Sequence, residues 1–447
     1  MSFSAVTYQN EFLAKDSTEV HAIVTVDADD TAVASTADLQ KAIVLMIDTS
    51  SSMLQPATKI EAARTAAATA IALIPDGTLF AVIKGSHVAA LAYPINQYGL
   101  AYADDLTRAE AIGAVRQLKA DGGTAMSTWL DLARGILEQL PGSIRFAYLM
   151  TDGRNESEQR RELDAQLARC AGVFQCDARG VGANWMVDEL RLISSTLLGQ
   201  VDIIKNADEM VDDFRTFLER AIGKNVTDVR LRVWTPKGST TRFVRQVSPT
   251  VEALNPLPMP VNELTRDYPT GSWGAGESRD YHVCVDVPQG DIGDERLAAR
   301  VSLVVDDAVV AQSLVKALWT NDDALSTRIN AQVAHYTGQA ELAQNIKEGL
   351  EARRSHDDRT ATVKLGRAVQ LANESGNEQT VKLLKRVVDV DDLETGTVRL
   401  RRDVGALDEM ALDTRSTRTV RVRPAEPAEP ADPVESPSAP GTREDGA

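Results

Sequence analysis

The chain has 447 residues, enough for two or three domains of ordinary size. Hydrophobic residues make up 43% of it and charged residues 25%, as in a typical globular protein, and the formal net charge is -17. Such an acidic balance argues against non-specific nucleic-acid binding, which requires a basic face that displaces counterions.

The cysteines and the first residues bear on the compartment. Three cysteines are too few, and odd in number, for a disulfide framework, which favours a reducing environment. The first residues lack the basic start and apolar run of a secretory signal, and no stretch reaches the length of a membrane helix. We therefore expect a cytoplasmic protein that binds neither nucleic acid nor membrane.

The first segment, residues 1–39, contains strand-like sequence over 3–27. Apolar residues alternate there with side chains of the other face, namely Val20, Ala22, Val24 and Val26. The next segment offers these strands no obvious place. We expect them to join a β-sandwich formed later in the chain, with the intervening domain as an insertion.

Residues 40–223 alternate short apolar runs with helical patterns. The runs cover 42–47, 79–83 and, less purely, 144–150. Unbroken apolar strands are typical of a parallel sheet that is covered on both faces. Helical spacing is seen at Ile60, Ala63, Ala67, Ile71 and Ile74, and again near 104–120, 125–140, 156–170 and 206–222. This alternation predicts a doubly wound, mostly parallel α/β sheet.

Two further units and a tail follow. Residues 224–320 return to a period of two, with Pro and Gly between the runs, which predicts an antiparallel β-sandwich. Residues 321–390 have helical patterns, and we expect a mostly disordered tail over 391–447, which ends in Pro-, Ala- and acid-rich sequence. The helical region carries apolar stripes that could pack on the sandwich, which we favour, or form a partner groove: Leu342, Ile346, Leu350, Val363, Leu365 and Val369.

Oxygen-bearing side chains follow the strands of the α/β segment. The first apolar run ends in Asp48-Thr49-Ser50-Ser51-Ser52, a DxSxS motif. Asp121-Gly122-Gly123-Thr124 precedes a predicted helix, and Thr151-Asp152-Gly153 closes a later strand. In an open α/β sheet, ligand sites form outside the carboxyl ends of the strands, where these segments are expected.

These three segments, in this order, resemble the metal-ion-dependent adhesion site (MIDAS) of von Willebrand factor type A (VWA) domains. The resemblance covers about 40–222. It implies that a divalent cation, Mg²⁺ or else Mn²⁺, is bound by five residues: Asp48, Ser50, Ser52, Thr124 and Asp152. Because much of this ligand set is neutral hydroxyl, the ion would keep positive character and an open position for an acidic residue of a protein partner. Alternatively, the hydroxyls only cap turns and helices while Asp48 bonds loop amides.

Enzyme motifs are not apparent in the sequence. A haloacid dehalogenase-like nucleophile would require a second Asp at position 50, which is Ser, and no P-loop or GxSxG motif is present. The five histidines do not follow a metal-binding spacing such as HExxH, and Cys170 and Cys176 resemble ordinary buried thiols. We therefore predict a cytoplasmic, non-catalytic regulatory or scaffolding protein. The alternatives are a non-catalytic VWA subunit of an ATPase or chelatase-like complex, and a metal-free structural module.

The C-terminal segment contains a short repeat. Thr397-Val398-Arg399-Leu400-Arg401 recurs as Thr419-Val420-Arg421-Val422-Arg423. Such alternating sequence can form edge strands. Our sharper hypothesis is that Thr395, Thr397 or Thr419 is phosphorylated, since a phosphothreonine could dock on an Arg-bearing reader. The partner of this protein would then include a phosphothreonine reader or a protein kinase. Alternatively, neighbouring arginines would clamp the phosphate back onto the acidic body.

Overall fold

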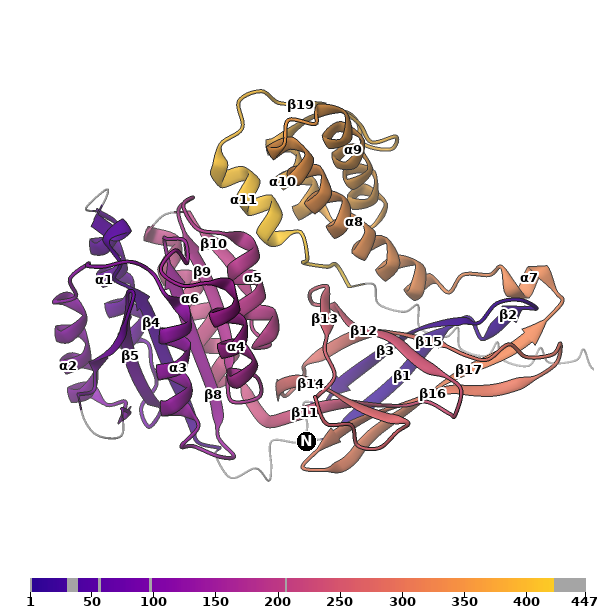
Figure 1. The fold of residues 1–447 in the computed structure, drawn as a ribbon, viewed down its shortest axis with the longest axis horizontal. Coiled ribbons are helices and arrows are strands. Elements are labelled where there is room, and N and C mark those ends of the chain that lie inside the picture. The colour runs from indigo at the N-terminus through magenta and orange to yellow at the C-terminus, as the bar shows by residue number, and fades with distance from the viewer. Residues whose placement is uncertain (1, 30–38, 55–57, 96–98, 206, 422–447) are drawn as a thin grey trace, which may run out of the picture.

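The computed structural model contains an α/β domain, a β-sandwich and a helical unit, arranged as in Figure 1. It describes residues 2–29, 39–54, 58–95, 99–205 and 207–421. In Figure 1 the helical unit lies above the other two parts and contacts both. Among the described residues, no helix is long and apolar enough to cross a membrane.

The α/β domain has a seven-stranded sheet in the order β10-β9-β8-β4-β5-β6, with β7 also paired to β5. Its strands are β4 (Lys41–Asp48), β5 (Leu79–Gly85), β6 (Ala89–Tyr93), β7 (Ala101–Tyr102), β8 (Ile144–Thr151), β9 (Gln175–Val181) and β10 (Val201–Ile204). The pairs from β10 to β5 are parallel, whereas β6 and β7 run antiparallel to β5. The predicted mostly parallel, doubly wound sheet is confirmed.

Helices cover both faces of this sheet. They are η1 (Ser51–Leu54), α1 (Thr58–Ala72), α2 (Asp105–Arg116), α3 (Met126–Leu137), α4 (Arg160–Cys170), α5 (Val187–Thr196) and α6 (Ala207–Ile222). A hydrophobic core lies on each face of the sheet, and successive residues of β4 point into opposite cores. Val44 belongs to the core with α3, α4 and α5, and Leu45 belongs to the core with α1, α2 and α6. A strand with both faces buried is mostly apolar, which explains the unbroken run that ends at Asp48.

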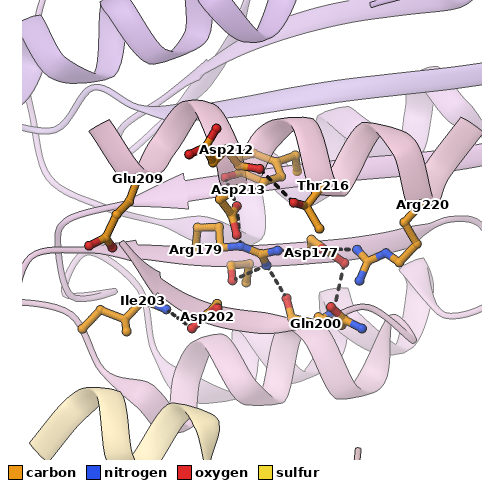
Figure 2. Close-up of polar contacts among 12 residues, drawn as sticks. Asp177, Arg179, Gln200, Asp202, Ile203, Glu209, Asp212, Asp213, Thr216 and Arg220 are labelled. Carbon is orange, nitrogen blue, oxygen red and sulfur yellow. Dashed lines mark hydrogen bonds and ion pairs between the residues drawn. The ribbon is translucent and has the colours of Figure 1, made fainter. Parts of the chain in front are cut away.

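Strands β9 and β10 carry buried charges that hid them from the search for apolar runs. Arg179 Nη2 lies 3.0 Å from Asp177 Oδ2, and Arg179 Nε lies 2.7 Å from Asp213 Oδ2 on α6. Arg220 also bonds Asp177, as Figure 2 shows. Charges can be buried at this edge of the sheet because each has an oppositely charged partner.

The β-sandwich consists of two five-stranded sheets, β1-β3-β15-β12-β13 and β14-β11-β16-β17-β2. Its strands are β1 (Phe3–Gln9), β2 (Phe12–Ala14), β3 (Glu19–Ala28), β11 (Lys224–Trp234), β12 (Thr240–Ser248), β13 (Glu252–Leu254), β14 (Thr265–Gly274), β15 (Ser278–Asp286), β16 (Glu295–Val305) and β17 (Ala308–Thr320). All pairs are antiparallel except β17 with β2. Because β3 pairs along its length with β15, the α/β domain is an insertion between β3 and β11.

The helical unit follows a short helix, α7 (Asp323–Ser326), and has its own core. Its elements are α8 (Ala331–Arg354), α9 (Asp358–Glu374), α10 (Glu378–Val387), β18 (Val388–Asp392), β19 (Thr397–Leu400) and α11 (Ala406–Arg415). The stripe residues Leu342, Ile346, Leu350, Leu365 and Val369 pack against one another here, not on the sandwich as we favoured. Val363 is 64% exposed, so its place in the stripe was wrong.

The expectation of a mostly disordered tail from residue 391 was also wrong for its described part. Residues 388–400 form the β18–β19 hairpin, and α11 buries Leu412 in the core of the helical unit. These elements are too short for a strong pattern, and they gain their burial from α8, α9 and α10. The Pro-, Ala- and acid-rich stretch, 424–433, lies outside the described residues.

An ionic contact fixes α11 to the α/β domain and can be tested. Asp202 of β10 accepts hydrogen bonds from Arg415, at 2.8 Å, and from Arg418. Burial alone would raise the pKa of the Asp202 carboxyl. Arg418 and Arg415 lower it by more than burial raises it, so the pKa lies below its ordinary value. The stability that these pairs contribute is therefore present above a pH of about 4 and is lost as the pH falls below it.

We predict that Asp202→Asn loosens α11 at neutral pH. Loss of the charged partner should cost about 2 kcal/mol and should speed amide hydrogen exchange in α11. The control is Asp212→Asn, because the Asp212 side chain is 81% exposed and forms an ion pair with Arg215 on its own helix. Unchanged exchange in α11 of the Asp202 variant would contradict this role.

Candidate metal centre

Three loops meet at the carboxyl edge of the sheet. Asp48 ends β4 and Thr151 ends β8, and these strands are parallel neighbours. Backbone bonds attach the 48–52 loop to the loop before α3: Ser51 N donates to Gly122 O at 2.8 Å, and Asp121 N donates to Thr49 O at 2.7 Å. The edge geometry therefore follows from backbone pairing and not from side chains alone.

The loop after β8 is attached in the same way. Ser157 N donates to Thr124 O at 2.9 Å, and Thr124 N donates to Ser157 Oγ at 3.1 Å. Thr124 therefore lies between the loop that contains Asp48 and the loop that contains Asp152. All three predicted segments are held at one place.

The side chains of the DxSxS motif form a chain of hydrogen bonds. Ser50 Oγ lies 2.8 Å from Ser52 Oγ, and Ser52 Oγ donates to Asp152 Oδ1 at 2.8 Å. Asp48 Oδ1 accepts from Ser50 N at 2.7 Å, and Asp48 Oδ2 accepts from Thr151 Oγ1 at 2.5 Å. The alternative without a metal predicted that Asp48 accepts a hydrogen bond from a loop amide, and the bond from Ser50 N is such a bond. The two serine hydroxyls, in contrast, bond each other and a carboxylate.

Gly153 marks the point where the remaining oxygens converge. A Cβ placed on it would lie 3.0 Å from Ser52 Oγ, 3.4 Å from Thr124 Oγ1 and 3.7 Å from Asp48 Oδ2. One oxygen from each of the first two loops, and a third from the end of β4, thus border the same small space. A larger side chain at this position would fill it.

The charge balance of this edge favours a bound cation. Asp48 and Asp152 are both 0% exposed. Burial raises the pKa of the Asp48 carboxyl, and the nearby Asp152 raises it further, against hydrogen bonds from Ser50 and Thr151 that lower it. Among the residues that the structure describes, no cationic side chain forms an ion pair with Asp48. A buried carboxylate without a counter-charge is costly, and a cation would offset that cost.

Lys59 is a component of the site that the sequence reasoning missed. Its Nζ lies 2.5 Å from Asp152 Oδ2, and its side chain is only 17% exposed. Lys59 is in the first turn of α1, directly after the DxSxS loop and η1. That position on the helix was the available signal, but we read the helix only for its apolar stripe.

A hollow of about 440 Å³ opens beside these oxygens. Ser50, Ser52 and Thr124 line it together with Gly122, Gly123, Gly153, Arg154, Glu156, Ser157 and Asn184. Ser52 and Arg154 are exposed, whereas Ser50 and Thr124 are buried. Carboxylate and hydroxyl oxygens are the ligands that Mg²⁺ and Mn²⁺ prefer, so the five predicted residues fit such an ion.

The predicted phosphorylation sites lie elsewhere. Thr395 and Thr397 are exposed at the turn between β18 and β19, with their hydroxyls 2.8 Å apart. The Thr419 hydroxyl donates to Val247 O at 2.7 Å, which attaches this segment to the end of β12. Exposure therefore favours the first two threonines as substrates of a kinase.

The chain is similar to known proteins over most of its length. Family models described as the von Willebrand factor type A domain and the von Willebrand factor type A C-terminal domain match residues 43–155 and 370–416. A solved structure described as von Willebrand factor type A from Catenulispora acidiphila is 46% identical, covers 94% of this chain and 97% of its own, and superposes with a TM-score of 0.88.

A more distant structure shares the fold alone. The ArnB paralog VWA2 from Sulfolobus acidocaldarius is 14% identical over 93% of this chain and 98% of its own, with a TM-score of 0.55. No curated protein sequence matches this chain. On the high identity to the Catenulispora protein over nearly the full length of both chains, this chain belongs to the von Willebrand factor type A family.

Proposed function

We propose that this protein binds a protein partner through a divalent cation held by Asp48, Ser50, Ser52, Thr124 and Asp152, and that it does no chemistry of its own. The observation that carries the proposal is the convergence of oxygens around a buried carboxylate, Asp48, which has no cationic partner among the described residues. Mg²⁺ is the proposed ion, and Mn²⁺ would fit the same ligands.

The exposed side of the site suggests the chemistry of the partner. Three of the five ligands are neutral hydroxyls, so the ion retains positive charge toward the hollow. Arg154 and Glu156 are both exposed on the same hollow, so a partner would meet one positive and one negative side chain beside the ion. An acidic side chain of a partner would complete the coordination of the ion and pair with Arg154. This arrangement suits a regulatory or scaffolding protein.

The proposed compartment is the cytoplasm. Cys170, Cys176 and Cys284 are buried free thiols in the structure, which is compatible with a reducing environment.

One observation favours the alternative of a metal-free module. The Lys59 ammonium already neutralises Asp152, as a bound cation would. Lys59 and a metal ion would then compete for the same carboxylate. The two readings predict different results when the lysine is removed.

The first of three predictions from this proposal concerns metal binding itself. Titration of Mg²⁺ or Mn²⁺ should release or absorb heat and should stabilise the wild type, by about 2.7 kcal/mol at an ion concentration one hundred times the Kd. Asp48→Ala and the isosteric Asp48→Asn should lose both effects. Asp121→Ala is the matched control, because Asp121 is an exposed carboxylate on the neighbouring loop.

Partner binding should follow the metal. Protein captured by the wild type should be released by a chelator and should not be retained by the Asp48 variants. A partner that the Asp48→Asn variant retains equally would contradict the metal-dependent function, as would a wild type that responds to neither ion.

The second prediction concerns the competition at Asp152. Lys59→Met should destabilise the metal-free protein by about 3 kcal/mol, because it leaves a buried carboxylate unpaired. The same change should raise the Mg²⁺ affinity roughly tenfold or more, since the ion no longer displaces an ammonium group. Thermal unfolding with and without Mg²⁺ measures both effects. Destabilisation that Mg²⁺ does not reverse would support the metal-free module.

The third prediction concerns regulation through the hairpin turn. We propose that Thr395 or Thr397 is phosphorylated and read by a phosphothreonine-binding module, because both hydroxyls are accessible. Mass spectrometry of protein isolated from growing cells should find phosphate on one of them, and not on Thr419. If all three threonines are unmodified, the hypothesis fails.

A further inference from the structure

A second group of metal-binding side chains lies on the sandwich, outside the α/β domain. On β3 and β15 the residues that face the sandwich core include Val20, Ala22, Val283 and Val285. Because side chains alternate along a strand, the residues between them point to the outer face of the sheet. That face carries Glu19, His21, His282 and Cys284.

The pairing of the two strands brings three of these residues together. Cys284 lies directly opposite His21 in the antiparallel register. His21 Nε2 is 2.8 Å from Glu19 Oε1, and Cys284 Sγ is 3.4 Å from the same oxygen. The three donor atoms all lie within 4.8 Å of one another. The ligands of a tetrahedral zinc ion are roughly 3.3–3.8 Å apart, so small rotations would suffice.

The other atoms of these side chains are oriented by neighbours. Glu19 Oε2 is bonded by Arg242, which leaves Oε1 toward His21 and Cys284. His21 Nδ1 lies 2.9 Å from Nε2 of His282, which is 3% exposed. A metal-binding histidine commonly donates its second nitrogen to such a partner, which fixes the ring and the tautomer.

The surroundings are half-closed. Cys284 is buried, and Phe243 packs edge-on against His282 at 5.0 Å and lies 6.2 Å from the ring of His21. Glu19 and His21 are each 38% exposed. An ion could therefore enter from solvent and would be bordered on one side by an aromatic ring.

We propose that Glu19, His21 and Cys284 form a second metal site, suited to Zn²⁺ or a cation of similar softness, with the fourth position open to water or to a ligand from another molecule. One thiolate, one imidazole and one carboxylate favour zinc over magnesium, whereas the oxygen ligands at the edge of the α/β sheet suit magnesium or manganese. Binding forms a bond to the Cys284 sulfur and releases the thiol proton to solvent.

Cobalt titration tests this site and distinguishes it from the oxygen site at the edge of the α/β sheet. Co²⁺ added to the reduced full-length protein should produce a sulfur-to-cobalt charge-transfer band and visible tetrahedral bands at one equivalent, and Zn²⁺ should abolish them. Oxygen ligands alone give no sulfur band, so Asp48→Asn should leave it unchanged. A failure of the function proposed above is thus distinguishable from a failure of this proposal.

Variants identify the ligands. Cys284→Ser should lose the charge-transfer band, and His21→Gln should weaken Co²⁺ binding at least tenfold. Cys170→Ser is the control and should retain the band, because Cys170 is buried in the α/β core beside Gln166. In the wild type, Zn²⁺ should also protect Cys284 from alkylation, which does not depend on how any variant folds. The absence of a sulfur band in the wild type, or its survival in Cys284→Ser, would overturn the proposal.

Discussion

The constraint on which the rest of this structure depends is the burial of both faces of the α/β sheet. Strands such as β4 and β8 therefore carry mainly apolar side chains along their length, and the oxygen-bearing groups of the candidate site lie at their carboxyl ends. Parallel pairing then brings Asp48 and the Thr151–Asp152 segment to the same edge. Backbone bonds from the 48–52 loop to the loop at Asp121 and Gly122 complete the arrangement. The candidate metal centre is a consequence of this packing as much as of its five ligands.

Buried carboxylates are treated in two different ways in this domain. At β9, Asp177 is neutralised by Arg220 and Arg179, and these partners hold its pKa below the ordinary value in spite of burial. At β4, Asp48 is as deeply buried but has no cationic partner among the described residues, and its pKa is raised. The first arrangement is complete within the fold, whereas the second is suited to a cation from solvent. Lys59 forms an ion pair with Asp152, so a cation that bound at this edge would compete with the ammonium group for that carboxylate.

The helical unit connects the two other parts of the molecule. Asp202 on β10 bonds Arg415 and Arg418, and Arg191 on α5 bonds Asp413 of α11. Tyr336 of α8 packs on Ile23 and Val247 of the sandwich, and its hydroxyl donates to Asp280. The α/β domain is joined to the sandwich by the chain at β3 and again at β11. Its ion pairs with α11 attach it to the rest of the molecule at a third place. Metal or partner binding at the sheet edge would therefore act on a domain whose orientation is held from two sides.

The sequence by itself determined the features that depend on local pattern. The apolar runs identified β4, β5 and β8, and the DxSxS, GGT and TDG segments identified the family and the residues that the sheet brings together.

Tertiary structure decided the rest. Strand β9 escaped notice because Asp177 and Arg179 interrupt its apolar pattern, and strand β10 because it is short and contains Asp202. The burial of these charges becomes tolerable only through partners far along the chain, on α6 for β9 and at Arg415 and Arg418 for β10. The helical stripes were visible, but whether they met the sandwich or each other depended on contacts between distant helices. Glu19, His21 and Cys284 show no motif, since more than 260 positions along the chain separate Cys284 from the other two residues. Spacing along the chain reports which side of an element is buried, whereas the partners across a sheet or between domains are set by pairing that spacing does not encode.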